Sequence, residues 1–502
     1  MKIKFDGKIL VIGCGGVAQC FLPLLVKHLE MPPHKITVID FTDKTEAIAD
    51  IIQAGVNFKK DRVTKENISS KLAEYVGGGD IIIDLAWNID CNTILQWCHE
   101  HNVRYVNTSV EEWDPYASAE NTSPQKRTLY YRQMQIREML ASWKEKGPSA
   151  VIDHGANPGL VSHFVKVALV DIANKLLQDR PPDARAENLQ KYLQAENWPK
   201  IAQALGVKVI HISERDTQVI DKPKQLNEFV NTWSIEGFYE ESIAPAELGW
   251  GTHELSLPPY ALTHSRGPQN QICLARMGAK TKVRSWTPCG EITGMVIRHG
   301  EAFSISDYLT VWGSGEAGKY SGGEADKHIG AEPVYRPTVH YAYCPCDGAQ
   351  LSIAELEMRQ FKLHEKQRIL RDEIIDGRDE LGVLLMGHDF KSWWTGSLLD
   401  IHTARQLAPR QNATTLQVAC SVLGALFWLI HNPQEGVKNP DQLPYKEVLE
   451  VARPYLGEFV SLPSNWDPTQ NRRDIDMFNK YRPQPRRIDE NLMWQFNTFL
   501  VE

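Results

Sequence analysis

Residues 8–18, Lys-Ile-Leu-Val-Ile-Gly-Cys-Gly-Gly-Val-Ala, decide the fold of the first third of this chain. The apolar half of this stretch is typical of a short buried strand, and apolar residues at helical spacing follow over residues 17–29. The junction fits the pattern G-x-G-x-x-G/A, in which Gly13 permits a tight turn and Gly15 lets the backbone approach a pyrophosphate. A helix N-terminus after such a turn favours phosphate groups. We therefore predict a dinucleotide-binding turn with cofactor contacts from Gly13, Gly15, Gly16 and Val17.

The rest of the first 150 residues alternates between short apolar runs and segments with helical spacing. Strands alternating with helices are typical of a parallel, doubly wound sheet of the Rossmann type. The predicted strands are Lys35–Ile39, Asp80–Leu85, Val103–Val106 and Ala150–Asp153, and the predicted helices are Cys91–His101 and Leu129–Lys144.

Asp40 ends the predicted strand that follows the glycine turn. A carboxylate at this place accepts hydrogen bonds from both ribose hydroxyls of NAD and repels the 2′-phosphate of NADP. The sequence therefore predicts NAD as the cofactor. The alternative is a fold of the same type that binds no dinucleotide, with Asp40 as a solvated strand end.

In the middle of the chain the alternation of strands and helices stops, and the predicted strands follow one another with few helices between them. This pattern predicts a second α+β domain with a mostly antiparallel sheet, and helical spacing predominates again beyond Ile353. We predict a NAD-binding domain at residues 1–155, a substrate-binding domain at 156–375 and a C-terminal helical segment at 376–502. Within the last of these, Thr414–His431 is expected to pack back on the first domain. The predicted strands of the second domain are Val207–Ser213, Glu228–Ile235, Gln271–Arg276, Thr293–Arg298 and Val334–Tyr343.

Composition and charge exclude several classes of protein. The 502 residues carry a formal net charge of −8, which argues mildly against a nucleic-acid partner. Nine cysteines without a regular framework favour a reducing, cytoplasmic setting, and the N-terminus shows no signal peptide. The apolar run Leu416–Ile430 is too short for a membrane span and predicts a buried helix. No metal is predicted, because Cys344-Pro-Cys346 lacks a second ligand pair.

The glycine-rich stretch Gly313–Gly330 is expected to be a mobile loop. Part of it, Gly313–Tyr320, comes within one residue of a phosphate-binding loop. A tyrosine cannot replace the serine or threonine hydroxyl that such a loop presents to magnesium, so we reject that interpretation.

Ligands of an open α/β sheet bind at the carboxyl ends of its strands. The residues that follow the predicted strands are therefore candidates for contact with the cofactor or the substrate. They include Ala86, Trp87, Asn88, Thr108, Ser109, Glu112, Asp153 and Asn157. The sequence Asn157-Pro-Gly is also a turn signature, and a turn without a ligand is the alternative.

Two segments of the predicted second domain supply an acidic and aromatic mixture, the first through its acidic residues and the second through both kinds. They are residues 212–218, with Glu214 and Asp216, and residues 231–241, with Trp233 and Glu241. Either segment alone would more often be a solvated strand face or loop. An aromatic face combined with carboxylates is, however, a common way to bind an organic ammonium group.

Taken together, six motifs resemble those of bacterial homospermidine synthases, a family within the saccharopine dehydrogenase-like superfamily. The resemblance extends over nearly the whole chain, and the last four motifs are more specific than the first. The motifs are Gly13-Cys-Gly-Gly-Val17, Gly155-Ala-Asn-Pro-Gly159, Ser213-Glu-Arg-Asp-Thr217, Asn231-Thr-Trp-Ser234, Gly249-Trp-Gly-Thr-His-Glu254 and Asp379-Glu-Leu-Gly-Val383.

This resemblance implies an enzyme that condenses two putrescines, or spermidine and putrescine, to homospermidine, with NAD as a bound hydride carrier. It implies that Trp233 acts as a cation–π partner of the reacting atoms and that Glu214 and Glu241 bind ammonium groups. Asn157, Glu112 and His299 would line the site near the cofactor, with Asp379 as a weaker candidate. It also implies a homodimer.

Two other functions stay open at this point. A saccharopine or carboxynorspermidine dehydrogenase would need arginines in its pocket to bind substrate carboxylates, and the acidic 212–241 segments speak modestly against it. A dinucleotide-binding protein without turnover would form no product from putrescine and NAD.

Overall fold

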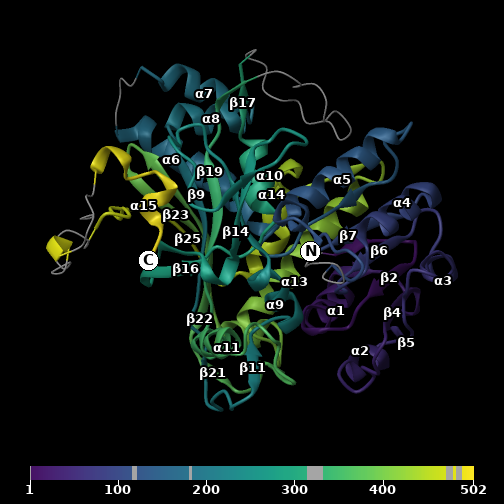
Figure 1. Cartoon of the computed structure of the whole chain (residues 1–502). Helices are drawn as coiled ribbons and strands as arrows, with labels where there is room; N and C mark the ends of the chain where they lie inside the picture. Colours follow the sequence, from purple (N-terminus) through teal and green to yellow (C-terminus); the bar gives the residue numbers. More distant parts are fainter. Residues whose placement is uncertain are drawn as a thin grey trace.

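The computed structural model describes residues 2–115, 121–179, 184–313, 332–470, 479–481 and 489–501. The predicted mobile loop at 313–330 lies outside these residues, apart from Gly313. Two sheets dominate the described part of the chain, the first on the right of Figure 1 and the second at the centre and left.

The first sheet is parallel throughout, with the strand order β24-β8-β7-β6-β2-β4-β5. The predicted Rossmann-type sheet is thus confirmed, and its order reverses beside β2, the strand that precedes the glycine turn. Helices α1 (Gly16–His28), α4 (Cys91–His101) and α5 (Leu129–Ser142) match the predicted helices closely. The strands are β2 (Ile9–Ile12), β4 (Ile36–Asp40), β5 (Asn57–Lys60), β6 (Ile81–Asp84), β7 (Arg104–Asn107), β8 (Ala150–Val151) and β24 (Val437–Lys438).

The second sheet is mixed, because β9 and β19 run parallel and the other pairs run antiparallel. Its main path is β13-β14-β12-β19-β9-β22-β23-β25, with β15 and β16 beside β19. These strands are β9 (Val209–Asp216), β12 (Pro245–Gly249), β13 (Ala261–Thr263), β14 (Gln271–Met277), β15 (Lys282–Thr287), β16 (Gly290–Met295), β19 (Thr338–Cys344), β22 (Arg378–His388), β23 (Lys391–Asp400) and β25 (Glu458–Ser464).

The predicted helical segment at 376–502 is wrong over its first part, where β22 and β23 form a hairpin of the second sheet. Almost every residue of these two strands is buried on both faces. Because both faces are buried, apolar residues do not alternate with polar ones in Leu381-Gly-Val-Leu-Leu-Met386, and this pattern cannot be distinguished from that of a buried helix. The sheet therefore continues across residue 375, and the domain division itself stays a prediction.

The predicted strand Glu228–Ile235 is also too long. Strand β11 (Glu228–Asn231) ends early because Ser234 caps helix α9 (Ile235–Ile243), accepting a hydrogen bond of 3.1 Å from the backbone N–H of Gly237. Trp233 thus lies in the short connection between a strand and a helix.

Helix α13 (Ala413–His431) is 19 residues long, has a mean hydropathy of 1.8 and is 89% buried within the protein. It is long and apolar enough to cross a membrane by composition, but it packs against α1, α14 (Tyr445–Ala452) and strands of both sheets. Figure 1 shows α13 between the two sheets, so it is a core helix that joins them.

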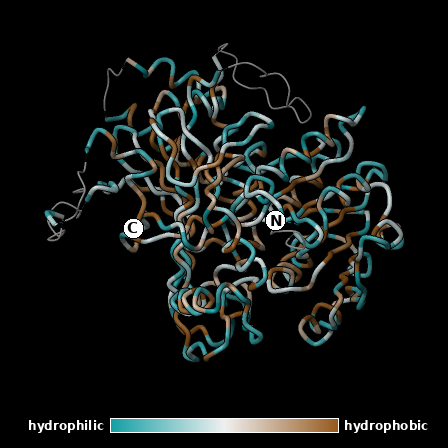
Figure 2. The backbone as a smooth tube through the Cα atoms, in the orientation of Figure 1, coloured by the Kyte–Doolittle hydropathy of each residue, from teal (hydrophilic) through white to brown (hydrophobic). Residues whose placement is uncertain are grey.

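The remaining elements cover the two sheets, and Figure 2 shows the hydrophobic segments gathered in the interior. The helices are α2 (Ala49–Gln53), α3 (Ile68–Tyr75), α6 (Leu160–Asp179), α7 (Ala186–Gln194), α8 (Trp198–Leu205), α10 (Glu301–Tyr308), α11 (Asp347–Met358), α12 (Ile401–Leu407) and α15 (Phe496–Phe499). Short pairs are β1 (Ile3–Lys4) with β3 (Leu29–Glu30), β10 (Val219–Ile220) with β21 (Ile374–Asp376), β11 with β20 (Lys366–Ile369), and β17 (Val311–Trp312) with β18 (Pro333–Tyr335).

Candidate active site

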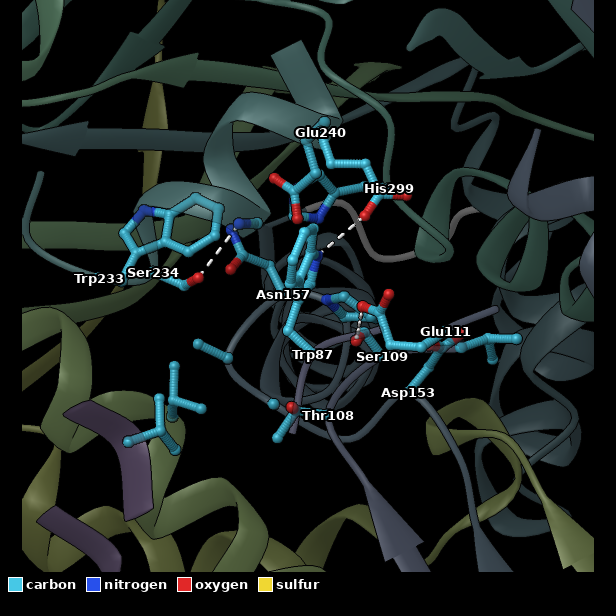
Figure 3. A pocket seen from close by; sticks show the side chains of 18 of the residues that line it. Trp87, Thr108, Ser109, Glu111, Asp153, Asn157, Trp233, Ser234, Glu240 and His299 are labelled. Atoms are coloured by element: carbon cyan, nitrogen blue, oxygen red, sulfur yellow. Dashed lines mark hydrogen bonds and ion pairs between the residues drawn. The ribbon is translucent and has the colours of Figure 1, made fainter. Parts of the chain in front are cut away.

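A cavity of about 190 Å³ lies between the carboxyl ends of the first sheet and the second sheet. Residues after β6, β7 and β8 form one wall, and residues of β9, α9 and the 298–299 segment form the other. Figure 3 shows Trp233, Asn157, Glu240 and His299 gathered above Thr108. Five carboxylates line the cavity together with two arginines and one histidine: Glu111, Asp153, Glu214, Glu240, Glu241, Arg132, Arg298 and His299.

The glycine turn has the geometry that a pyrophosphate needs. Gly13 has a φ of +89°, and a Cβ there would lie 2.8 Å from the backbone oxygen of Leu85, so a side chain is excluded. A Cβ at Gly15 would meet no atom within 4 Å, which leaves room for a ligand over the N-terminus of α1. Asp40 accepts a hydrogen bond of 2.8 Å from the backbone N–H of Cys14, which fixes its carboxylate beside the turn. These residues fit a dinucleotide.

The other predicted cofactor contacts line the cavity itself. Val17 projects from the first turn of α1, Ala86 follows β6, and Thr108 and Ser109 follow β7. Asn157 lies in a tight turn after β8, where the N–H of Gly155 donates to the oxygen of Pro158 at 2.7 Å.

Four residues form what we call the aromatic side of the cavity: Asn157, Glu214, Trp233 and Tyr341. The Glu214 carboxylate accepts hydrogen bonds from Asn157 Nδ2, at 2.6 Å, and from the Tyr341 hydroxyl. The indole N–H of Trp233 donates to the Tyr343 hydroxyl at 3.1 Å, which orients the ring. Burial raises the pKa of Glu214 to about 7. Among the residues described, no cation hydrogen-bonds to Glu214 to oppose this rise.

His299 lies between two carboxylates. Its Nε2 is 3.0 Å from Glu241 and its Nδ1 is 3.3 Å from Glu301. Burial opposes its protonation, but Glu241 and Glu301 together raise the pKa of His299 well above its ordinary value. The imidazole is therefore charged, and it neutralises part of the negative charge next to Glu241.

Three further residues form what we call the arginine side: Arg132, Glu240 and Arg298. Glu240 pairs with Arg132 at 3.1 Å and with Arg298, and it also accepts a hydrogen bond of 3.0 Å from the indole N–H of Trp87. Although burial disfavours its charge, the two arginines lower the pKa of Glu240 to about 2. This carboxylate is thus ionised and fully compensated by protein groups.

Two families match this chain. The saccharopine dehydrogenase NADP binding domain matches residues 9–151, and the saccharopine dehydrogenase C-terminal domain matches residues 155–462. Homospermidine synthase from Blastochloris viridis is 39% identical over 507 residues, covering 99% of this chain and 98% of that protein. Homospermidine synthase from Mesorhizobium japonicum is 37% identical over 507 residues, covering 99% of this chain and 97% of that protein.

The chain belongs to the homospermidine synthase family. A solved structure agrees with this assignment: the homospermidine synthase of Legionella pneumophila in complex with NAD has a TM-score of 0.83 and 37% identity. The alignment covers 100% of this chain and 99% of that one. The predicted family and fold class are therefore confirmed, and the turn at Gly13–Val17 belongs to a dinucleotide-binding domain.

The structure brings most of the predicted site residues of this family member together. Trp233, Glu214, Glu241, Asn157 and His299 all line the cavity. Glu112 does not, because its side chain turns away to pair with Arg132 at 3.1 Å and lines a neighbouring cavity.

Several residues that line the cavity were not predicted from the sequence. Glu111 takes the place expected for Glu112, and Ser109 donates a hydrogen bond of 2.6 Å to it. The sequence shows two adjacent glutamates here, and it does not show which of the two side chains faces the cavity. Arg132 lies within a predicted helix, where a lone arginine looks like a solvated residue, and Tyr341 gave no signal beyond its predicted strand.

Proposed function

We propose that this chain is a homospermidine synthase, which joins two putrescines into homospermidine and releases ammonia. The observation that carries the proposal is a cavity beside the dinucleotide turn with an excess of carboxylates and an aromatic face. A diamine with two ammonium groups matches that excess of negative charge, and the curated relatives bear the same name.

Glu214 and Glu241 bind the ammonium groups. Burial raises the pKa of Glu241 as it does that of Glu214, although His299 offsets part of the rise at Glu241. A cation that enters the cavity therefore stabilises the ionised form of both carboxylates, and that of Glu214 most. A carboxylate–ammonium contact is a charge-assisted hydrogen bond, stronger than one between neutral groups. Asn157, which donates to Glu214, positions that carboxylate against the cofactor side.

Trp233 stabilises positive charge on the reacting carbon and nitrogen. Its indole ring lines the same cavity as Glu214, and its N–H donates a hydrogen bond to Tyr343, which leaves the ring face for the substrate. An indole face attracts a cation most strongly where water is excluded. This matters because both the oxidised amine and the condensed product pass through a cationic imine.

The cofactor is NAD, held by Gly13, Gly15, Gly16, Val17 and Asp40, with Ala86, Thr108, Ser109 and Asn157 around its reactive end. When bound, NAD accepts a hydride from the first amine and returns it to the condensed imine. The matching domain family is named for NADP, but the Asp40 carboxylate would repel a 2′-phosphate.

A dehydrogenase for a carboxylated amine is the alternative that one observation favours. Arg132 and Arg298 line the cavity, as such an enzyme would require. Both already pair with Glu240, and Arg132 also pairs with Glu112, so a substrate carboxylate would have to displace an internal partner.

The test is incubation of the protein with putrescine and NAD far below stoichiometric amounts, followed by mass spectrometry and NADH absorbance. Homospermidine should accumulate over many turnovers without lasting NADH. Stoichiometric NADH without homospermidine would identify a plain dehydrogenase, and no change in either signal would indicate a binding protein without turnover.

The finer features of the proposal are a homodimer that works in the cytoplasm and accepts spermidine as a second aminobutyl donor. The proposed domain division remains 1–155 for NAD and 156–375 for the substrate, with 376–502 completing both sheets. Size-exclusion chromatography with light scattering tests the dimer, and release of diaminopropane from spermidine tests the second donor.

A further inference from the structure

Two buried aspartates that the proposed reaction does not use meet beneath the aromatic side. Asp216 of β9 faces Asp379 of β22 directly across their antiparallel pairing. Glu214 lies two residues before Asp216 and therefore on the same face of the sheet. Glu214 has a relative exposure of 3%, and Asp216 and Asp379 have none. A row of three buried carboxyl groups thus leads inward from the cavity.

Within the described residues, no cationic side chain forms an ion pair with Asp216 or Asp379. Burial raises the pKa of Asp216, and the Arg215 guanidinium on the opposite face opposes that rise only in part. Thr232 and Trp233 face the row from the segment before α9, Tyr343 and Cys346 from β19 and its end, and Thr414 from α13. Of these, only Tyr343 and Cys346 titrate, and both are neutral in their protonated form. Arg215, Arg378 and Glu380 alternate to the opposite face, where Arg215 pairs with Asp347 and Arg378 with Glu380.

The two inner carboxyl groups have different hydrogen-bond partners. Asp216 accepts three hydrogen bonds: from the backbone N–H of Gln218 at 2.9 Å, from its side-chain amide at 3.0 Å and from the Thr232 hydroxyl at 3.0 Å. Among the residues that the structure describes, the Asp379 carboxyl group hydrogen-bonds only to the Thr414 hydroxyl, at 2.6 Å from its Oδ2, and its buried Oδ1 has no partner. Three donors suit an ionised carboxylate, whereas a single hydroxyl partner suits a carboxylic acid.

We propose that Asp379 is a neutral carboxylic acid and that it forms a proton relay with Thr414, Thr232 and Asp216. The Asp379 hydroxyl donates to Thr414 at 2.6 Å, Thr414 donates to Thr232 at 3.5 Å, and Thr232 donates to Asp216 at 3.0 Å. Each hydroxyl hydrogen then has one acceptor. If Asp379 were ionised, the Thr414 hydrogen would point to it and the contact between the two threonines would have no hydrogen.

The relay makes Asp379 a positioning residue for Glu214. One proton held in the inner pair removes one of three negative charges from the row, so Glu214 can ionise when an ammonium group arrives. Thr414, an inner member of the relay, also lines the cavity, so the relay reaches the site. Burial, followed by the charges of Glu214 and Asp216, raises the pKa of Asp379 well above its ordinary value, in agreement with this assignment.

Infrared difference spectroscopy tests the proton directly. At a pH of about 9 the buried carboxyl groups with a pKa of about 7 are ionised, and the proposal requires that Asp379 keep its proton there. The wild-type protein should show a carboxylic-acid C=O band that Asp379→Asn lacks. The matched control Asp376→Asn changes an exposed carboxylate at the end of β21 and should leave the band intact. Identical wild-type and Asp379→Asn spectra would overturn the proposal.

Two further measurements complete the test. Thr414→Val removes the hydroxyl partner and should shift the band, which keeps the proposal falsifiable if Asp379→Asn does not fold; an unshifted band would contradict the relay. The kinetic measurement rests on the proposed function, whereas the spectra do not. The relay requires an ionised Asp216, so Asp216→Asn should lower kcat/KM for putrescine by about tenfold or more, and an unchanged kcat/KM would contradict the relay.

Discussion

The aromatic side and the arginine side of the cavity present the same carboxylate group in opposite surroundings. Glu240 has two guanidinium partners and a pKa of about 2, whereas Glu214 has only neutral donors and a pKa raised by burial to about 7. Glu240 is thus satisfied by the protein itself, whereas Glu214 is available to the proposed ammonium ligand. The comparison teaches that a residue's partners, more than its burial, separate a structural carboxylate from a binding one.

The largest expected effect follows from breaking the arginine side. Glu240→Gln leaves Arg132 and Arg298 buried, with side-chain exposures of 3% and 5%, and without their shared counter-charge. Removal of one partner from a buried pair costs about 3–5 kcal/mol in the free energy of unfolding. Urea denaturation measures this loss. Glu236→Gln on the same helix is the control and should change stability by less than about 0.5 kcal/mol. Equal stability of the two variants would contradict a structural role for Glu240.

The same Glu→Gln substitution on the aromatic side should lower activity and leave stability unchanged, the reverse of what we expect for Glu240→Gln. Glu214→Gln keeps the shape of the side chain and removes a charge that no protein cation compensates, so the fold should be unharmed. Loss of a charge-assisted hydrogen bond to the ammonium group costs about 1.5–3 kcal/mol, or about a ten- to hundredfold fall of kcat/KM for putrescine. Steady-state kinetics and calorimetric NAD binding measure the two effects. Normal turnover in both Glu214→Gln and Glu241→Gln would mean that the ammonium sites lie elsewhere.

The first domain could be predicted from sequence because its signals are local. The glycine turn, the period of the helices and the Asp40 strand end each depend on a few neighbouring residues. Strand β24 could not be predicted, since it has two residues and pairs with β8 from a distant part of the chain. The hairpin of β22 and β23 was missed for another reason: both of its faces are buried, so its apolar pattern has no period.

The residues of the candidate site divide in the same way, into those that local sequence predicts and those whose role depends on distant partners. Glu214, Trp233 and Glu241 could be predicted as a set because they lie in short motifs that resemble those of the family, within segments rich in acidic or aromatic residues. Arg132 and Arg298 could not, because their role exists only through Glu240, which lies 108 and 58 residues away. The arginine side therefore arises from tertiary pairing alone, and the choice between Glu111 and Glu112 depends on a loop geometry that the sequence does not encode locally.

Trp233 gives the aromatic side of the cavity an indole ring face for contact with a cation, and the three residues of the arginine side include no ring. A cation–π contact in a site without water is worth about 2 kcal/mol, so Trp233→Ala should lose about thirtyfold in kcat and remain folded. Trp233→Phe should keep part of the activity, and Trp233→Glu should keep little, because a carboxylate attracts putrescine but offers no ring face. Paired measurement of kcat and Tm tests this. A Trp233→Ala protein that melts far lower, yet keeps its activity per folded molecule, would make Trp233 a core residue.

The smallest expected effect is a pH dependence that comes from the uncompensated carboxylates. Burial is the main cause that raises the pKa values of Glu214, Glu111 and Asp153 to about 7. Each group therefore binds its proton more tightly in the folded chain than in the unfolded chain. By linkage, their contribution to the free energy of unfolding is complete below the unfolded pKa of about 4 and is lost as pH rises through about 7.

Putrescine should oppose that loss, because its ammonium groups supply the charge that the aromatic side lacks. Saturating putrescine should then raise Tm more at a pH of about 8 than at about 6, with a difference on the order of 1 kcal/mol in stability. The Glu214→Gln variant should lose much of this difference, whereas the arginine side contributes nothing to it, since Glu240 stays ionised across the whole range. Thermal unfolding of both proteins at the two pH values measures the effect. A putrescine shift that is equal at both pH values would show that the carboxylates are already charged before the amine binds.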